Sequence, residues 1–238
     1  MANVQFTVNN QLDQPVDENV LVFLVPTQAS ADFQLAAWQS LNIGTGGSIG
    51  FAYTNDIQVQ VQRMDTMSLS KRVKIAAGQV WDAVLDNVSG LKLVQELKNG
   101  PNAGAATPDQ CVVFNEVVDP KTPNDAVLIQ VMWYVNNSPC VAKPNLNYQS
   151  RSAFQLEASL YFSAAEPTDQ GFNYTLQQLS NETQYFIPAS AADVTVTWTR
   201  PGGLSGVDTF TFDPPSEPPP SAKSAPAKAM RAQAQASA

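Results

Sequence analysis

The chain lacks histidine and contains little charge and little cysteine. Its 238 residues include no His, two Cys and only 14% charged residues, against about 25% in an average soluble domain. Without histidine, Ser-His-Asp and Cys-His catalysis and His-liganded zinc or copper are excluded. Two cysteines are too few for a four-thiolate zinc site or an iron–sulfur cluster.

Basic side chains are also scarce. The chain has 13 Lys and Arg against 21 Asp and Glu, a formal net charge of -8. A charge-poor acidic chain has no electrostatic footprint for nucleic acid or an anionic membrane, so we expect neither partner. The longest apolar run, 20–26, is far shorter than the ~20 residues of a membrane helix.

The first residues, MANVQFTVNNQLDQ, contain no basic segment followed by an apolar one. They do not resemble a secretory signal, so we expect a cytoplasmic protein and leave export without a leader open. In a reducing compartment Cys111 and Cys140 are expected to be free, half-buried thiols, although a disulfide between them stays open.

Apolar and polar residues alternate in several segments, as in strands with one buried face. Val194, Val196 and Trp198 alternate with threonines, and the segment 57–62 reads IQVQVQ. Gly- and Pro-containing turns separate many such segments. The sequence therefore predicts an all-β antiparallel sandwich, jelly-roll-like or built from two related halves, with few short helices. The best helix candidates are 89–97 and a turn near 33–41.

Composition changes sharply at Pro214. The segment 214–238 is dominated by Pro, Ala and Ser and has no aromatic residue. It buries too little apolar surface to offset the entropy of ordering, so we expect a sandwich domain over 1–213 and a disordered tail over 214–238.

Two segments of the expected sandwich resemble each other. Residues 20–63 align with 158–200, with Phe23 matching Tyr161 and Arg63 matching Arg200. One interpretation is an internal duplication. The other is that any two amphipathic strands share period-two alternation.

Aromatic residues are candidates for ligand contact, because exposed rings stack on sugar rings. Trp38, Phe172 and Tyr174 lie in segments that the alternation does not assign to buried strands, and they are the candidate ligand-binding residues. Packing in the core is the alternative for each of them.

Oxygen-bearing side chains gather after the first expected strand. Asp13, Asp17, Glu18 and Asn19 are close in sequence, and calcium prefers six to eight oxygen ligands. They are a candidate calcium site, although an acidic connecting loop is the alternative, and no other cofactor is expected.

Carboxylates are the main general acids and bases left in a chain without histidine. A glycoside hydrolase needs two of them across a groove. Glu116, Glu157, Glu166 and Glu182 are available, but no spacing singles out a catalytic pair.

The sequence contains no family motif, and it favours a non-enzymatic protein that acts by binding or self-association. Neutral strand faces of the Gln-Val-Gln and Thr-Val-Thr type are flat, and an edge strand of this kind pairs readily with another copy. We therefore expect a homo-oligomer, with a glycan or another protein as further partners. A lectin-like module is the first alternative, and a carboxylate-dependent glycoside hydrolase is the second.

Overall fold

The computed structural model describes residues 3–26, 32–86, 90–97, 99–118, 127–156, 159–165, 174–175 and 182–217. Nearly all regular structure in these segments is β-strand, which confirms the predicted fold class. The one helical element among them is a 3-10 turn at Gly203–Ser205. In the described part of the chain, no helix is long and apolar enough to cross a membrane.

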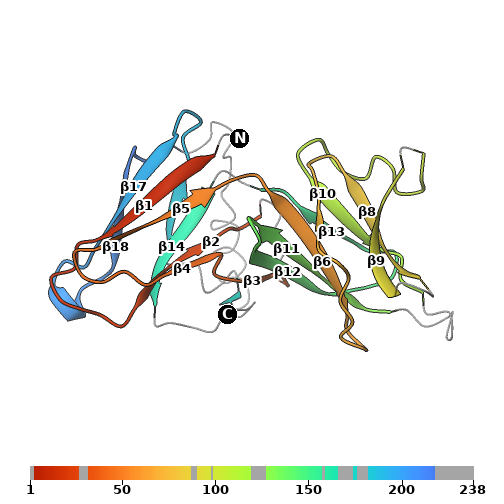
Figure 1. The fold of residues 1–238 in the computed structure, drawn as a ribbon, viewed down its shortest axis with the longest axis horizontal. Helices are drawn as coiled ribbons and strands as arrows, with labels where there is room; N and C mark the ends of the chain where they lie inside the picture. Colours follow the sequence, from red (N-terminus) through yellow and green to blue (C-terminus); the bar gives the residue numbers. More distant parts are fainter. Residues whose placement is uncertain are drawn as a thin grey trace, which may run out of the picture.

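The strands form two sandwiches that lie side by side (Figure 1). Sandwich 1 contains sheet A, in the order β18 (Thr209–Asp213), β17 (Asp193–Thr199), β1 (Val4–Asn10) and β5 (Ser48–Tyr53). Facing it is sheet B, in the order β16 (Thr183–Phe186), β14 (Ser159–Ala165), β2 (Asn19–Phe23) and β4 (Gln39–Leu41). Rings from both sheets fill the space between them: Phe6 packs on Phe162, and Tyr185 stacks on Phe212.

Sandwich 2 contains sheet D, in the order β9 (Gly90–Gln95), β8 (Val80–Asp86), β10 (Cys111–Asn115) and β13 (Arg151–Phe154). Facing it is sheet C, in the order β7 (Val73–Lys74), β6 (Ile57–Arg63), β11 (Ile129–Val135), β12 (Ser138–Leu146), β3 (Gln34–Leu35) and β15 (Tyr174–Thr175). The stacked rings of Trp133 and Phe154 join the two sheets, with centroids 5.1 Å apart.

The two sandwiches share one topology. The order β18-β17-β1-β5 in sheet A corresponds to β9-β8-β10-β13 in sheet D. In each sheet the central pair is parallel and the two outer pairs are antiparallel. The order β16-β14-β2-β4 in sheet B likewise corresponds to β7-β6-β11-β12 in sheet C, with every pair antiparallel.

A buried asparagine ends β1 in sandwich 1. Asn10 Nδ2 donates to Ile43 O (2.7 Å), and its Oδ1 accepts from Leu12 N (2.9 Å). The backbone N–H of Gly46, at φ 73°, donates to Asn10 O. This one side chain thereby ties the end of β1 to the loop between β4 and β5.

The same arrangement recurs at the end of β10 in sandwich 2. Asn115 Nδ2 donates to Leu146 O (2.8 Å) and Val127 O (2.7 Å), and its Oδ1 accepts from Val117 N (3.1 Å). The N–H of Gln149, at φ 58°, donates to Asn115 O. The shared topology therefore extends to single hydrogen bonds.

The two sandwiches do not correspond to the two halves of the chain, because strands from each half contribute to both sandwiches. Residues 4–53 and 111–154 supply equivalent strands, and so do 57–95 and 159–213. The strands that have a counterpart come from 4–53 and 159–213 in sandwich 1 and from 57–154 in sandwich 2; β3 and β15 add two further strands to sheet C. Each sandwich thus takes one unit from each half of the chain.

This correspondence differs from the expected alignment of 20–63 with 158–200. The structure relates β6 to β14 and β8 to β17. Phe23 and Tyr161, which the sequence alignment matched, are instead opposite each other on the neighbouring strands β2 and β14.

Trp38 joins the two sandwiches. Its Nε1 donates to Val135 O on β11 (2.8 Å), and its ring meets Phe51 and Tyr53 of β5 edge-on, at 5.5 and 6.0 Å. Asn136 adds a second link, because its Nδ2 donates to Ala52 O (2.9 Å). These contacts fix the position of one sandwich against the other.

Neither helix candidate is helical in the described residues. The helix expected over 89–97 is strand β9, whose leucines alternate with polar residues and pack inward against the core. The region near 33–41 contributes the short strands β3 and β4.

The start of the expected tail is held on β16, where Tyr185 Oη donates to Pro214 O (3.1 Å) and Phe186 N donates to Ser216 Oγ (2.9 Å). Residues 218–238 lie outside the described residues, so the predicted disorder stays a prediction there.

Candidate functional site: the polar face of sheet A

The outward face of sheet A is formed by neutral polar side chains. Val194, Val196 and Trp198 of β17 point into the core, and the threonines between them point outward. The same alternation holds on β1 and β18. We call this surface the polar face; it consists of Gln5, Thr7, Asn9, Gln11, Ser48, Thr195, Thr197, Thr199, Thr209 and Thr211.

Strand pairing arranges these side chains in rows. Thr7 is opposite Thr195, Thr197 is opposite Thr211, and Thr199 is opposite Thr209. Neighbouring strands are about 4.8 Å apart, and alternate residues on a strand are about 6.6 Å apart. The face therefore offers a regular array of hydroxyl and amide groups, each of which both donates and accepts hydrogen bonds.

Charge is confined to one end of the sheet. Asp193 is opposite Gln5, and Asp213 is opposite Thr195. No charged side chain of sheet A lies among Asn9, Thr197 and Thr211 or beyond them toward Ser48. The outward strand residues at the opposite end are uncharged, and we call it the neutral end; the ion pairs of Arg200 with Glu18 and Asp208 lie just beyond the strands there.

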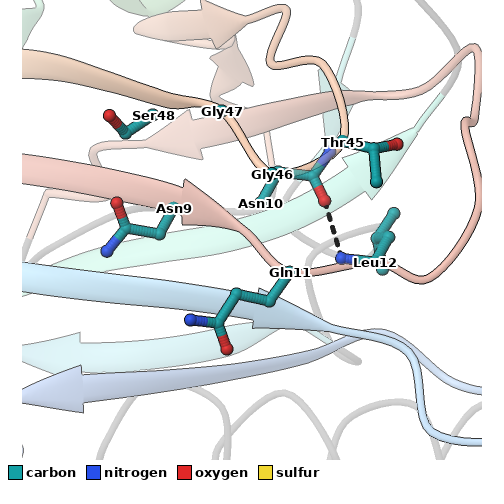
Figure 2. A pocket seen from close by; sticks show the side chains of 8 residues that line it. All are labelled: Asn9, Asn10, Gln11, Leu12, Thr45, Gly46, Gly47 and Ser48. Atoms are coloured by element: carbon teal, nitrogen blue, oxygen red, sulfur yellow. Dashed lines mark hydrogen bonds between the residues drawn. The ribbon is translucent and has the colours of Figure 1, made fainter.

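An open hollow of about 450 Å³ lies at this neutral end, lined by residues 9–12 and 45–48. Figure 2 shows Asn9 and Gln11 extending from β1, Ser48 from the start of β5, and Thr45 from the adjoining loop. Its size falls within the ~300–1,000 Å³ of small-molecule pockets.

The polar groups that line the hollow divide into two sets. Both polar atoms of the Asn10 side chain bond to the protein, Nδ2 to Ile43 O and Oδ1 to Leu12 N, and these bonds hold the backbone at the end of β1. Within the described residues, the side chains of Asn9, Gln11 and Ser48 form no hydrogen bond to the protein, so their hydrogen-bonding capacity is free for a ligand.

The equivalent surface of sandwich 2 has different chemistry. The counterparts of Asn9, Gln11 and Ser48 are Phe114, Glu116 and Arg151, from the matching strand register. Arg151 Nη1 donates to Ala105 O (3.0 Å) in the segment 96–110. The outward Val112 side chain is also fully buried there. This segment therefore covers in sandwich 2 the surface that is open in sandwich 1.

The glutamine face of β6 is also occupied. Gln60 Nε2 donates to Ser70 O (2.8 Å), Gln62 Nε2 donates to Met67 O (3.3 Å), and Gln58 is buried. The sequence contains two neutral strand faces, one of glutamines and one of threonines. Of these two, the threonine face is the one that the described chain leaves uncovered.

Two of the three expected aromatic ligand residues lie in the described residues, and both pack against other rings of the protein. Trp38, for which the sequence left both ligand contact and core packing open, is 2% exposed because it packs between the sandwiches. Tyr174 is half-buried, with its ring edge-on to Phe23 at 4.9 Å. Phe172 lies outside the described residues.

The four expected calcium residues make different contacts. Asp13 and Asp17 are exposed, and Glu18 forms an ion pair with Arg200, which is also bound by Asp208. Asn19 Nδ2 donates to Ser40 Oγ (2.9 Å). Among the described residues, no group of three or more acidic, cysteine or histidine side chains is placed to hold a metal ion.

Carboxylates meet at one point on sandwich 2. The hydrogen bond that Glu96 shares with Asp82, together with desolvation and the charges of Asp82 and Glu116, raises the pKa of Glu96 to about 7. Asn102 Nδ2 donates to Asp82 (3.0 Å) and to Glu116 (3.4 Å). Directly bonded carboxyl groups are closer than the about 5–9.5 Å that glycosidases use.

The remaining candidates for proton transfer or nucleophilic attack are isolated or hidden. Burial raises the pKa of Glu182 above its usual range, and Glu157 and Glu166 lie outside the described residues. Both cysteines are free and buried, and burial raises the pKa of Cys111 to about 12. A thiol with so high a pKa is a poor nucleophile at neutral pH.

Comparison with known proteins gives no relative: no family model, no curated protein and no solved structure matches this chain. A function therefore has to be argued from the site itself.

Proposed function

We propose that the protein is a non-enzymatic binding protein whose polar face contacts a neutral, hydroxyl-rich ligand, a glycan. The observation that carries the proposal is the array of hydroxyl and amide side chains on sheet A, whose outward strand residues are uncharged at the neutral end.

The chemistry of this surface matches a neutral glycan. Sugar hydroxyls both donate and accept hydrogen bonds, as do the side chains of Thr7, Thr195, Thr197 and Thr211. Neutral groups lose less hydration energy than ions when a ligand covers them. Because sheet A holds these side chains on paired strands, little conformational entropy is lost on binding.

Self-association is the second outcome to test. Strands β18 and β5 are the two edges of sheet A, and an unpaired strand edge is a template for another chain. The expected homo-oligomer would form by pairing at one of these edges, and binding of a glycan to the face does not require it.

An array of neutral and acidic glycans, read with and without calcium, tests the proposal. We expect binding to neutral glycans in both conditions. Thr195→Val and Thr211→Val remove one hydroxyl each, and we expect each to weaken binding about 2- to 10-fold, the effect of one hydrogen bond of about 0.5–1.5 kcal/mol. Thr183→Val on β16, outside the face, is the matched control and should bind normally.

Three results would overturn the proposal. They are an array with no neutral glycan bound, equal binding by wild type and both face variants, and release of reducing sugar that is lost in Glu96→Gln. The last result would identify the protein as a hydrolase. Sedimentation of the same samples reports any self-association separately.

A further inference from the structure

We propose that the hollow at the neutral end of the polar face binds the terminal sugar unit of the glycan, so that the protein recognises the end of a chain. This inference rests on the proposed function and adds to it the part of the ligand that is recognised.

The hollow is continuous with the polar face. Asn9 and Ser48 are outward residues of sheet A and also line the hollow, as does Gln11, which directly follows β1. A glycan lying along the face toward this end therefore reaches the hollow, beside the loop 44–47 and the end of β1. An extended chain that continued past this point would leave its next units without contacts to the sheet.

The lining fits one neutral sugar ring. Asn9, Gln11, Thr45 and Ser48 present amide and hydroxyl groups, and Leu12 supplies an apolar wall. Sugar-sized pockets combine apolar contact with a few well-placed polar groups. The lining contains no charged residue, so the site favours a neutral unit over a uronic or sialic acid.

Two glycines line the hollow at a turn where sandwich 2 has larger residues. At the equivalent turn of sandwich 2, Gln149 and Ser150 stand where sandwich 1 has Gly46 and Gly47. Gln149 has φ 58° and Gly46 has φ 73°, so this turn accepts a side chain in the left-handed conformation. A Cβ on Gly46 would meet no atom within 4 Å. Gly46→Gln therefore keeps the turn and places a side chain in the open space.

Gly104→Gln is the matched control. Gly104 also has a positive φ, 81°, and a Cβ there meets nothing within 4 Å, but it lies on the exposed loop after β9 in sandwich 2. Both substitutions carry the same backbone penalty, so a difference between them in binding reports on the hollow. Circular dichroism and thermal unfolding of both variants confirm that they fold.

The probes are malto-, cello-, manno-, galacto- and chito-oligosaccharides of two to six units, each unmodified and chemically capped at its non-reducing end. Calorimetry of the wild-type protein against the series that binds should show at least tenfold weaker binding of the capped chains. Gly46→Gln should lower the affinity for uncapped chains at least tenfold, and Gly104→Gln should leave it unchanged.

The outcomes separate the two proposals. If Thr211→Val weakens binding but Gly46→Gln and end capping do not, the chain-end inference is wrong and the polar face remains the binding surface. If wild type binds none of the neutral glycans on the array or in this series, the proposed function is wrong, and the inference falls with it. If Gly46→Gln and capping both abolish binding and the controls bind normally, both proposals are supported.

Discussion

Truncation of the two equivalent asparagines tests whether the sandwiches share one framework. Asn115 is fully buried and forms three hydrogen bonds through its side chain, and Asn10 forms two. Replacement by alanine leaves the partner carbonyl and N–H groups buried without a hydrogen bond. A net loss of about 0.5–1.5 kcal/mol for each bond gives about 1.5–4.5 kcal/mol for Asn115→Ala and about 1–3 kcal/mol for Asn10→Ala.

Guanidinium denaturation followed by circular dichroism measures both effects. Asn42→Ala, an exposed asparagine in the same loop region as Ile43, is the control and should change the free energy of unfolding by less than about 0.5 kcal/mol. A loss below this limit for either Asn115→Ala or Asn10→Ala would refute the role assigned to the buried asparagines, and with it the equivalence of the two strand ends.

Three further predictions follow from single contacts. The pKa of Glu96 is raised in the folded state, so its contribution to the free energy of unfolding should be greatest below about pH 4.5 and should be lost as the pH rises to about 7. Glu96→Gln should flatten this part of the dependence of stability on pH, and an unchanged dependence would contradict the raised pKa. Cys111 and Cys140 are buried, so a thiol reagent should label them only after denaturation, and rapid labelling of native protein would be the contrary result. Trp38→Phe removes the hydrogen bond between the sandwiches and should cost about 1–3 kcal/mol by leaving a buried carbonyl unpaired; a variant as stable as wild type would show that this bond does not hold the junction.

Much of sheet A was predictable from local pattern. The alternation of Val194, Val196 and Trp198 with threonine gives strand, buried side and exposed side at once, because a strand has a period of two. Even so, the pattern did not distinguish the free threonine face from the glutamine face of β6. That difference depends on the chain segment around Ser70, which folds over the glutamines.

The exchange of strands between the two halves was not predictable from the sequence. Pairing of β1 with β17 joins residues nearly two hundred positions apart, and period-two alternation carries no information about which strand is the neighbour. The equivalent asparagines, Asn10 and Asn115, were the available signal. They are separated by unrelated loop sequences, so an alignment by strand pattern misses them.

The hollow was visible in the sequence only as the glycine-rich segment 44–50. This segment reads as a flexible turn, and its role depends on the side chains that β1 brings to it. Trp38 illustrates the converse: it follows a segment without clear alternation, so the pattern left its burial open, and the second sandwich covers it. Residues at the boundary of two packed units cannot be assigned from the pattern of one unit.

Mapping of backbone amide signals by NMR during titration with the neutral glycan that binds best tests the polar face most directly. The account predicts that the signals which shift belong to β1, β17, β18 and the loop 44–47, with those of Thr195, Thr197 and Thr211 among the largest changes. Shifts confined to sandwich 2, or to sheet B, would contradict it.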